Sequence, residues 1–441
     1  MEAIVKKILF NSLVIGTLWT TVGHIVQSFF YFLFLSFSGK VIGSEGVGIL
    51  GVFYSFYNFT SFLLGSGFRD YLSRKIVELK SKGENEKIKD LIDESFTYTL
   101  FVFFLSLLFF LILKNFLLEK FFNNNSFILF SAFLVHLFSV FSSIGLGFLI
   151  GKKLFYAFAF VHTLKGLIFL FFGFFYFIKR VSSTNLFVTV YILSEFSNFF
   201  FFLVYLIYLK KSLTFKINLN FLKEGILSMG FSNTIIQSYF GYPILLLKLK
   251  NVPDDLVGNF TAGISVFQAV KLLFNSYFVP VYPHISSFYY EGKKKKFFKT
   301  IIFSSILIFI SLLFFTLFII SIGKSILYLF FPKHKFKFYT SEFLLLSVSL
   351  LFYLFSRFFS RVFFAIQKEN IVFINFLLWL LVLTLPFLLL NFKNKIISLL
   401  ILNSFATFVN ALIFTVIFIK IFSPKGSIPL KEEKIRNEDI C

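Results

Sequence analysis

The sequence has little of what a water-soluble protein of this length needs. Only 15% of its 441 residues are charged, and acidic residues are the scarcer kind, with 21 Asp and Glu against 43 Lys and Arg. A typical soluble chain is about 25% charged. Cys441 is the one cysteine, so no internal disulfide and no cysteine-based metal cluster can form. These shortages exclude a soluble globular fold and a disulfide framework.

Apolar residues take the place of the missing charges. They make up 58% of the chain, 77 residues are Phe, and the mean hydropathy is +0.86. No soluble fold of this size hides so much apolar surface, so lipid is the expected solvent. The net charge of +22 comes from basic residues that lie mostly between the apolar runs. This placement is typical of membrane topology and argues against a nucleic-acid partner.

Twelve apolar segments are long enough to cross a bilayer, which takes about 20 helical residues. Helices are expected because a bilayer offers no partner for unpaired backbone groups. The segments are residues 10–37, 47–68, 96–113, 126–150, 154–178, 185–209, 226–249, 256–280, 300–322, 341–366, 371–390 and 396–419. Segment 323–340 is expected to be a mixed loop, and 69–94 an amphipathic helix and turn. If the N-terminus is inside, the inside loops carry a two-to-one excess of Lys and Arg over the outside loops, which predicts that both termini are cytoplasmic.

A weak internal repeat relates the two halves of the chain. Residues 25–58 match residues 235–268 without gaps at an offset of 210, with 9 of 34 positions identical. Six spans per half is an even number, so both halves enter the membrane from the same side and the symmetry axis lies along the membrane normal. The predicted fold is an all-α polytopic membrane protein with about 12 transmembrane helices in two six-helix lobes related by a pseudo-two-fold axis. The expected parts are lobes 1–210 and 223–422, a cytoplasmic linker 211–222 and a polar cytoplasmic tail 423–441.

Two short patterns, one in each half, carry a family resemblance. The first is a loop that opens the second span, followed by a basic run; the second opens the eighth span, which ends near two prolines. The residues are Gly43, Glu45, Gly46, Gly48, Arg69, Arg74 and Lys75, then Pro253, Asp254, Asp255, Val257, Gly258, Pro280 and Pro283. The chain thereby resembles Wzx-type flippases of O-antigen or capsule repeat units, in the polysaccharide-transport branch of the multidrug/oligosaccharidyl-lipid/polysaccharide (MOP) exporter superfamily, whose fold is MATE-like.

The resemblance implies a function. A flippase of this kind moves an undecaprenyl-pyrophosphate-linked oligosaccharide from the inner to the outer leaflet of the bacterial cytoplasmic membrane by alternating access. It implies as partners the lipid-linked oligosaccharide, membrane lipid, H⁺ or Na⁺, and other polysaccharide-assembly proteins. No cofactor and no metal are expected. The chain also lacks enzyme signatures: the lone Gly323-Lys324-Ser325 has Phe318 where a Walker A motif needs its first glycine.

A charged side chain inside a span is expensive and is therefore a functional candidate. Lys165 lies near the middle of the fifth predicted span, and His162, three residues earlier, lies on the same helix face. Lys165 either binds the pyrophosphate in a cavity or pairs with Glu195, which lies at a depth about 4–5 Å away in the sixth span. Both interpretations of Lys165 are open, and a Lys165–Glu195 pair can also line the cavity. Glu195 or His24 is a candidate for proton coupling; facilitated flipping down a gradient is the alternative.

Three more cations lie in predicted spans of the second half. Lys271 is a candidate cavity cation for the pyrophosphate, or it reaches back to the cytoplasmic interface. Arg357 and Arg361 are one helical turn apart and suit bidentate phosphate binding. Interfacial anchoring of the two arginines is the other interpretation.

Uncharged polar side chains in the first and seventh spans suit sugar hydroxyl groups. They are His24, Gln27, Asn233 and Gln237, of which Gln27 and Gln237 are related by the repeat. Such groups also hold membrane helices together.

Two other functions compete with the flippase interpretation. A multidrug exporter of the same superfamily is expected to bind cations with buried acids, whereas intramembrane cations outnumber acids here. A membrane-embedded glycan polymerase or glycosyltransferase would need a catalytic residue near the outer face, usually on a large outside loop.

Overall fold

The computed structural model describes residues 2–61, 67–209, 238–337 and 339–422, and every element in these ranges is an α-helix. The first half comprises α1 (Glu2–Ser61), α2 (Gly67–Ser81), α3 (Lys87–Ile112), α4 (Lys114–Lys120), α5 (Ser126–Gly151), α6 (Phe155–Ile178) and α7 (Thr184–Leu209). The second half comprises α10 (Gly241–Leu249), α11 (Asp254–Tyr290), α12 (Lys294–Phe330), α13 (Thr340–Ala365), α14 (Glu369–Leu389) and α15 (Lys395–Phe422). The predicted linker 211–222 and tail 423–441 lie outside the described residues.

Among the described residues, ten helices are long and apolar enough to cross a membrane. They account for eleven of the twelve predicted segments, because α1 contains the first and most of the second, whose residues 62–66 lie outside the described residues. Segment 226–249 lies mostly outside the described residues, which include only its last part in α10. The predicted all-helical membrane architecture is therefore confirmed.

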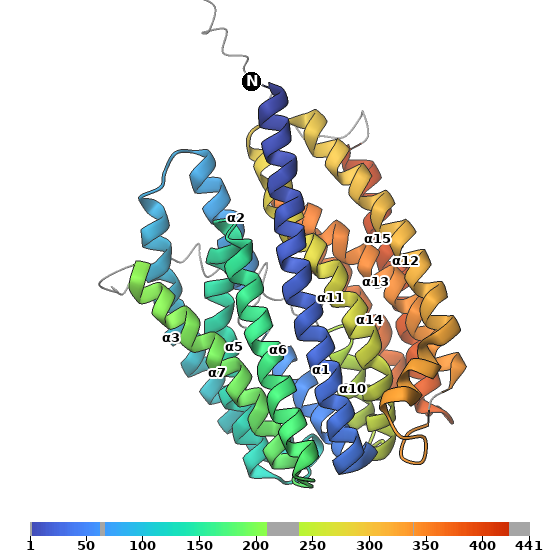
Figure 1. Ribbon diagram of the computed structural model, residues 1–441. Helices are drawn as coiled ribbons and strands as arrows, with labels where there is room; N and C mark the ends of the chain where they lie inside the picture. Colours follow the sequence, from blue (N-terminus) through green and yellow to red (C-terminus); the bar gives the residue numbers. More distant parts are fainter. Residues whose placement is uncertain (1, 62–66, 210–237, 338, 423–441) are drawn as a thin grey trace, which may run out of the picture.

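Gly43 divides α1 into two helical stretches. Its backbone has φ 73° and ψ −171°, a combination open to glycine and strained for residues with a Cβ atom. The first stretch descends from the end of the bundle that holds the N-terminus, and the second turns back from the opposite end (Figure 1). Gly43 thus forms the turn between the first two predicted spans.

Two helix ends differ from the sequence prediction. α12 continues through residues 323–330, which we expected to belong to a loop, because Gly323 and Leu327 are buried and Gly323 packs against Phe343 of α13. α11 continues to Tyr290, past the two prolines where we expected the eighth span to end. Neighbouring helices in a bundle re-satisfy the backbone groups that a proline frees.

The charged segment after the second span forms a helix and turn, as predicted, but several of the charged groups on the helix are buried. Asp70, Arg74 and Glu78 of α2 are all buried. α2 packs against α5 in its own half and against α11 in the second half. The helix therefore brings charged groups into the contact between the halves, at the end of the bundle that holds the N-terminus.

Each half packs mainly within itself, and the two halves meet along α1 and α11. In the first half α1 packs on α6 and α5 on α7, and in the second half α13 packs on α15 and α12 on α13. In Figure 1 the blue-to-green helices lie on one side of α1 and the orange-to-red helices on the other. Apolar side chains such as Ile112, Phe171 and Phe314 face outward, as expected for helices in lipid.

Repeat-related residues pack against one another where the halves meet. A Cβ atom on Gly48 would lie 2.0 Å from the backbone oxygen of Asp254, and one on Gly258 would lie 1.8 Å from the backbone oxygen of Ser44. Ser44 corresponds to Asp254 and Gly48 to Gly258 at the offset of 210 found in the sequence. Both contacts need glycine, so the two copies of the repeat meet in matching positions. This contact lies near the Gly43 turn.

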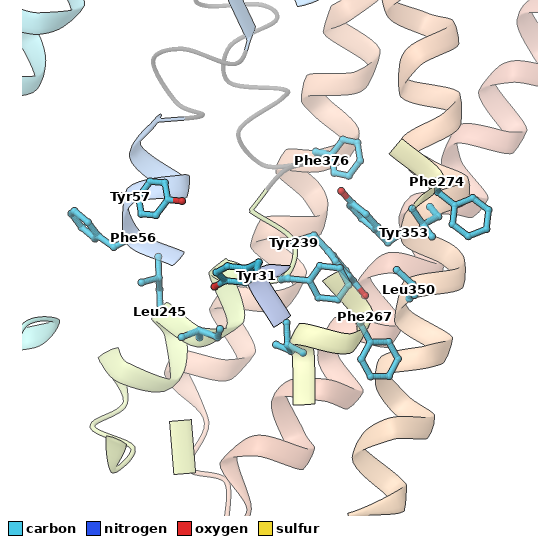
Figure 2. Packing of buried hydrophobic residues seen from close by; sticks show 14 of the residues in the cluster. Tyr31, Phe56, Tyr57, Tyr239, Leu245, Phe267, Phe274, Leu350, Tyr353 and Phe376 are labelled. Carbon is cyan, nitrogen blue, oxygen red and sulfur yellow. The ribbon is translucent and has the colours of Figure 1, made fainter. Parts of the chain in front are cut away.

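Aromatic rings from both halves share one core. Figure 2 shows Tyr31, Phe56 and Tyr57 of α1 together with Tyr239 and Tyr353 of the second half. The rings of Tyr239 and Tyr353 are stacked, with centroids 4.1 Å apart and planes 13° apart. The Phe-rich composition therefore supplies internal packing as well as lipid-facing surface.

Candidate functional site

Polar side chains of three first-half helices meet inside the bundle. Nδ1 of His162 on α6 lies 2.5 Å from Oε1 of Gln27 on α1, and the rings of His162 and His24 have centroids 4.7 Å apart. One turn further along α6, the ammonium group of Lys165 forms an ion pair with the buried carboxylate of Glu195 on α7. The chain folds these five residues into one polar network across α1, α6 and α7.

Glycines allow the close approach of α1 and α6 that this network needs. A Cβ atom on Gly166 would lie 2.9 Å from Cα of Gln27, and one on Gly23 would lie 2.7 Å from Cα of Ala159. Small residues at helix contacts are the usual way for membrane helices to approach closely. The two glycines therefore position Gln27 and His24 against α6.

Buried tyrosines adjoin the Lys165–Glu195 pair. The hydroxyl groups of Tyr31 and Tyr191 are 3.2 Å apart, and the ring centroid of Tyr54 lies 5.0 Å from that of Tyr31 and 6.0 Å from that of Tyr191. Glu195 interacts electrostatically with Tyr54 and Tyr57. Aromatic faces with polar edges are suitable surfaces for a sugar ring, because they pack on its CH groups and offer hydroxyl groups for hydrogen bonds.

Three cations of the second half form a separate buried cluster on α11 and α13. The ammonium group of Lys271 lies 5.6 Å from the ring centroids of both Phe240 and Tyr353. Arg357 is fully buried and interacts electrostatically with Lys271 and with Arg361 one turn away. None of the three lies at a lipid-facing surface: 9% of Lys271, 0% of Arg357 and 5% of Arg361 is exposed. The three side chains therefore lie inside the bundle, and their roles stay predictions.

A carboxylate from the first half reaches into this cluster. Oδ2 of Asp70 lies 2.6 Å from Nη1 of Arg361, and Oδ1 lies 3.4 Å from Nε of Arg69. Burial by itself raises the pKa of Asp70, but the guanidinium groups of Arg361, Arg69 and Arg357 outweigh it and lower that pKa below its ordinary value. Asp70 is therefore a carboxylate held charged between the halves.

Two further contacts join the halves beside Asp70. Arg74 on α2 forms an ion pair with Glu369 on α14, and its Nη1 lies 3.4 Å from the backbone oxygen of Phe364. The hydroxyl group of Tyr282 on α11 donates a hydrogen bond to the backbone oxygen of Asp70 at 3.3 Å. Charged and polar contacts thus join the halves toward the N-terminal end of the bundle, and glycine packing joins them near Gly43.

The structure sorts the candidate residues into two groups. His24, Gln27, His162, Lys165 and Glu195 lie together in the first half, and Lys271, Arg357 and Arg361 lie together in the second. Lys165 does pair with Glu195, the second of the two arrangements that the sequence left open. Asn233 and Gln237 lie outside the described residues.

Sequence reasoning missed the acidic members of the contact between the halves. Asp70 and Glu369 lie near the ends of apolar runs, where charges are ordinarily solvated. The available signal was the order of charges in α2, where an acid directly follows Arg69 and lies four residues before Arg74. Such i, i+4 spacing predicts a local pair, and it gives no sign that both side chains also have partners on the other half.

The second-half cluster has the chemistry of an anion site. Guanidinium groups one turn apart donate several hydrogen bonds in a fixed geometry that matches phosphate oxygens. Nε of Arg361 has no hydrogen-bond partner among the described residues. Among the described residues of both halves, no group of three or more His, Cys, Asp or Glu residues is arranged to hold a metal ion.

Solved structures with the same fold are membrane transporters. The chain matches an outward-facing multidrug resistance MATE transporter of the MOP superfamily (16% identity, TM-score 0.67) and a MOP superfamily transporter from Pyrococcus furiosus described as having a binding pocket of reverse polarity (17%, 0.67). Each match covers 92% of this chain and 95% of the other. A eukaryotic MATE transporter matches at 13% identity and a TM-score of 0.68, over 93% and 95%. These identities show a shared fold.

No curated protein matches the chain. A family model does match: residues 13–289 fit the model described as "Polysaccharide biosynthesis protein". The match covers more than half of the chain, including the first-half network, α2 and Lys271. The chain therefore belongs to the polysaccharide biosynthesis protein family, on the helical fold that MATE and other MOP superfamily transporters share.

Proposed function

We propose that this protein is a flippase. It moves an undecaprenyl-pyrophosphate-linked oligosaccharide of the O-antigen or capsule type from the inner to the outer leaflet of the bacterial cytoplasmic membrane. The observation that carries the proposal is the buried cationic cluster of Lys271, Arg357 and Arg361, which suits a diphosphate. Membership of the polysaccharide biosynthesis family and the transporter fold favour a transporter over an enzyme.

In this proposal the two halves take different parts of the substrate. The second-half cluster binds the pyrophosphate, and Gln27, His24 and the tyrosines beside Glu195 contact the glycan. Asn233 and Gln237 are assigned to the glycan as well, on the sequence alone. Lobes 1–210 and 223–422 rock about the contact of α1 with α11, with both termini in the cytoplasm, and the linker 211–222 connects them.

Ion coupling is proposed for the first-half network. Nδ1 of His24 and Nε2 of His162 are buried and have no hydrogen-bond partner among the described residues, so both are candidate proton acceptors. Lys165 and Glu195 form the adjacent pair. Protonation of Glu195 would break that pair, which gives H⁺ a route to change the packing of α6 against α7; Na⁺ is the alternative coupling ion.

A multidrug exporter of the same superfamily is the second candidate, favoured by the fold of the solved MATE transporters. A cationic drug needs a buried carboxylate that is available to it. Here Glu195 is paired with Lys165 and Asp70 with Arg361. The charge balance therefore favours an anionic substrate.

Substitution of the buried lysines tests the flippase role. We expect Lys165→Ala and Lys271→Ala each to lower surface glycan export by about 10-fold or more at normal protein level, since a contact to a charged group contributes about 1.5–3 kcal/mol. Lys179→Ala is the control, because Lys179 is exposed. Normal export by Lys271→Ala, at normal amounts in the membrane, would refute the assigned pyrophosphate site. Normal export by Lys165→Ala would refute a role in transport for its pair with Glu195.

A further inference from the structure

Asp70 occupies the position that an anionic ligand of the arginine cluster would take. Both of its carboxylate oxygens are engaged, Oδ2 by Arg361 at 2.6 Å and Oδ1 by Arg69 at 3.4 Å. The ring of Tyr282 lies against the same guanidinium group, 5.2 Å from Cζ of Arg361. Only 2% of Asp70 and 5% of Arg361 is exposed, so a ligand can take this place on the Arg361 guanidinium group only by replacing the carboxylate.

A diphosphate is chemically suited to replace it. A carboxylate carries one negative charge, whereas a diphosphate diester carries two and offers more acceptor oxygens to guanidinium groups. Arg357 lies one turn before Arg361 and interacts with it electrostatically, as does Lys271 with Arg357. A dianion therefore offers more negative charge and more acceptor oxygens to this group of cations than the single carboxylate does.

Asp70 also joins the two halves. It lies in the first turn of α2 in the first half, and its partner Arg361 lies on α13 in the second half. Its backbone oxygen accepts the hydrogen bond from Tyr282 on α11. Loss of the Asp70–Arg361 pair would therefore remove one of the contacts that join the halves.

We propose that Asp70 is an internal competitor for the diphosphate: its carboxylate fills the arginine cluster when substrate is absent, and the substrate diphosphate displaces it, which releases α2 from α13. Substrate binding is thereby coupled to opening of the N-terminal end. This inference rests on the proposed function, because it takes a diphosphate as the substrate's anionic group.

Binding of inorganic pyrophosphate to purified protein tests the competition. We expect Asp70→Asn to bind pyrophosphate about 10-fold more tightly than the wild type, because the variant lacks the competing charge; Asp70→Glu should stay near the wild-type affinity. Glu369→Gln is the matched control, since it removes another ion pair between α2 and the second half and leaves Asp70 in place. Its affinity should stay within about 2-fold of the wild type.

A second measurement needs no substitution at Asp70. Spin labels at the exposed positions Ser81 on α2 and Lys368 after α13, in a background with Cys441→Ser, report the separation of the two helices. The distance between the labels should increase with pyrophosphate and stay constant with the same ionic strength of sodium chloride.

Each outcome decides the inference. Competition between Asp70 and the diphosphate would be overturned if Asp70→Asn bound pyrophosphate no more tightly than the wild type, or if Glu369→Gln gained as much affinity as Asp70→Asn. A label distance that stays constant when pyrophosphate is added would overturn the coupling of binding to the separation of α2 from α13. If the wild type binds pyrophosphate while Asp70→Asn shows no gain, the inference fails and the proposed function stands. If Asp70→Asn shows the gain but deletion of the gene leaves the lipid-linked pool unchanged, the proposed function fails and the diphosphate site stands.

Discussion

The Lys165–Glu195 pair is the residue-scale feature with the most direct energetic consequence. Lys165 is mostly buried and Glu195 almost wholly so. Removal of one member of such a pair leaves an uncompensated charge, which costs about 3–5 kcal/mol, whereas removal of both costs far less. The pair can therefore be tested as a unit by a double-mutant cycle.

We expect Lys165→Met alone and Glu195→Gln alone each to lower the melting temperature strongly. The double variant Lys165→Met/Glu195→Gln should recover most of that loss, because no buried charge is left without a partner. Thermal unfolding of the purified proteins measures all four corners of the cycle. Additive losses would show that the two side chains do not stabilise the fold as a pair.

Gly48 and Gly258 form a second residue-scale feature. We expect Gly48→Ala to destabilise the protein by about 1–3 kcal/mol, the usual cost of overpacking, because its Cβ atom would lie 2.0 Å from a backbone oxygen. Gly263→Ala on α11 is the control, since its Cβ atom would meet no described atom within 4 Å. Equal melting temperatures for the two variants would contradict the close packing of the repeat copies.

At the scale of elements, α2 is the helix that differs most from its expected environment. Its apolar face and turn were readable from the sequence, but the burial of its charges was not. Hydropathy averages a helix over its length and places a charged helix in water. The second-half partners of Asp70 and Arg74 lie more than 280 residues away in sequence, so only the fold brings them together.

The pairing of α2 with α13 makes stability depend on pH. The pKa of Asp70 is lowered in the folded protein, so its stabilising effect is complete above the ordinary pKa of about 3.9 and is lost as the pH falls below it. We expect the wild type to lose thermal stability between pH 6 and pH 3 more steeply than Asp70→Asn. Parallel curves for the two proteins would contradict the charged state of Asp70.

The long apolar helices were the most predictable elements. Eleven of the twelve predicted segments correspond to described membrane-length helices, because a run of about 20 apolar residues has few other uses. Helix ends were less predictable: α12 continues through Phe330 because Leu327 and Gly323 are buried. Packing against a neighbouring helix decides such ends, and a single sequence does not reveal it.

At the scale of the whole molecule, the two halves are related by a repeat but contribute different kinds of side chain. The repeat copies meet at Gly48 and Gly258. The first half supplies a network of histidine, glutamine and tyrosine around one ion pair, and the second half supplies a cationic cluster. This division of charge is what suits a substrate with a polar glycan and an anionic linkage.

Transport of a lipid-linked glycan is the central claim, and the polyprenyl-linked pool tests it most directly. The polyprenyl-linked pool and the surface glycan are measured in cells with and without the gene. An enzyme probe added outside the cells reports which leaflet holds the lipid-linked repeat units. We predict that deletion leaves complete single repeat units on the inner leaflet and abolishes surface glycan. Unpolymerised units on the outer leaflet would instead indicate a polymerase. An unchanged lipid pool with new drug sensitivity would contradict the claim and favour a multidrug exporter.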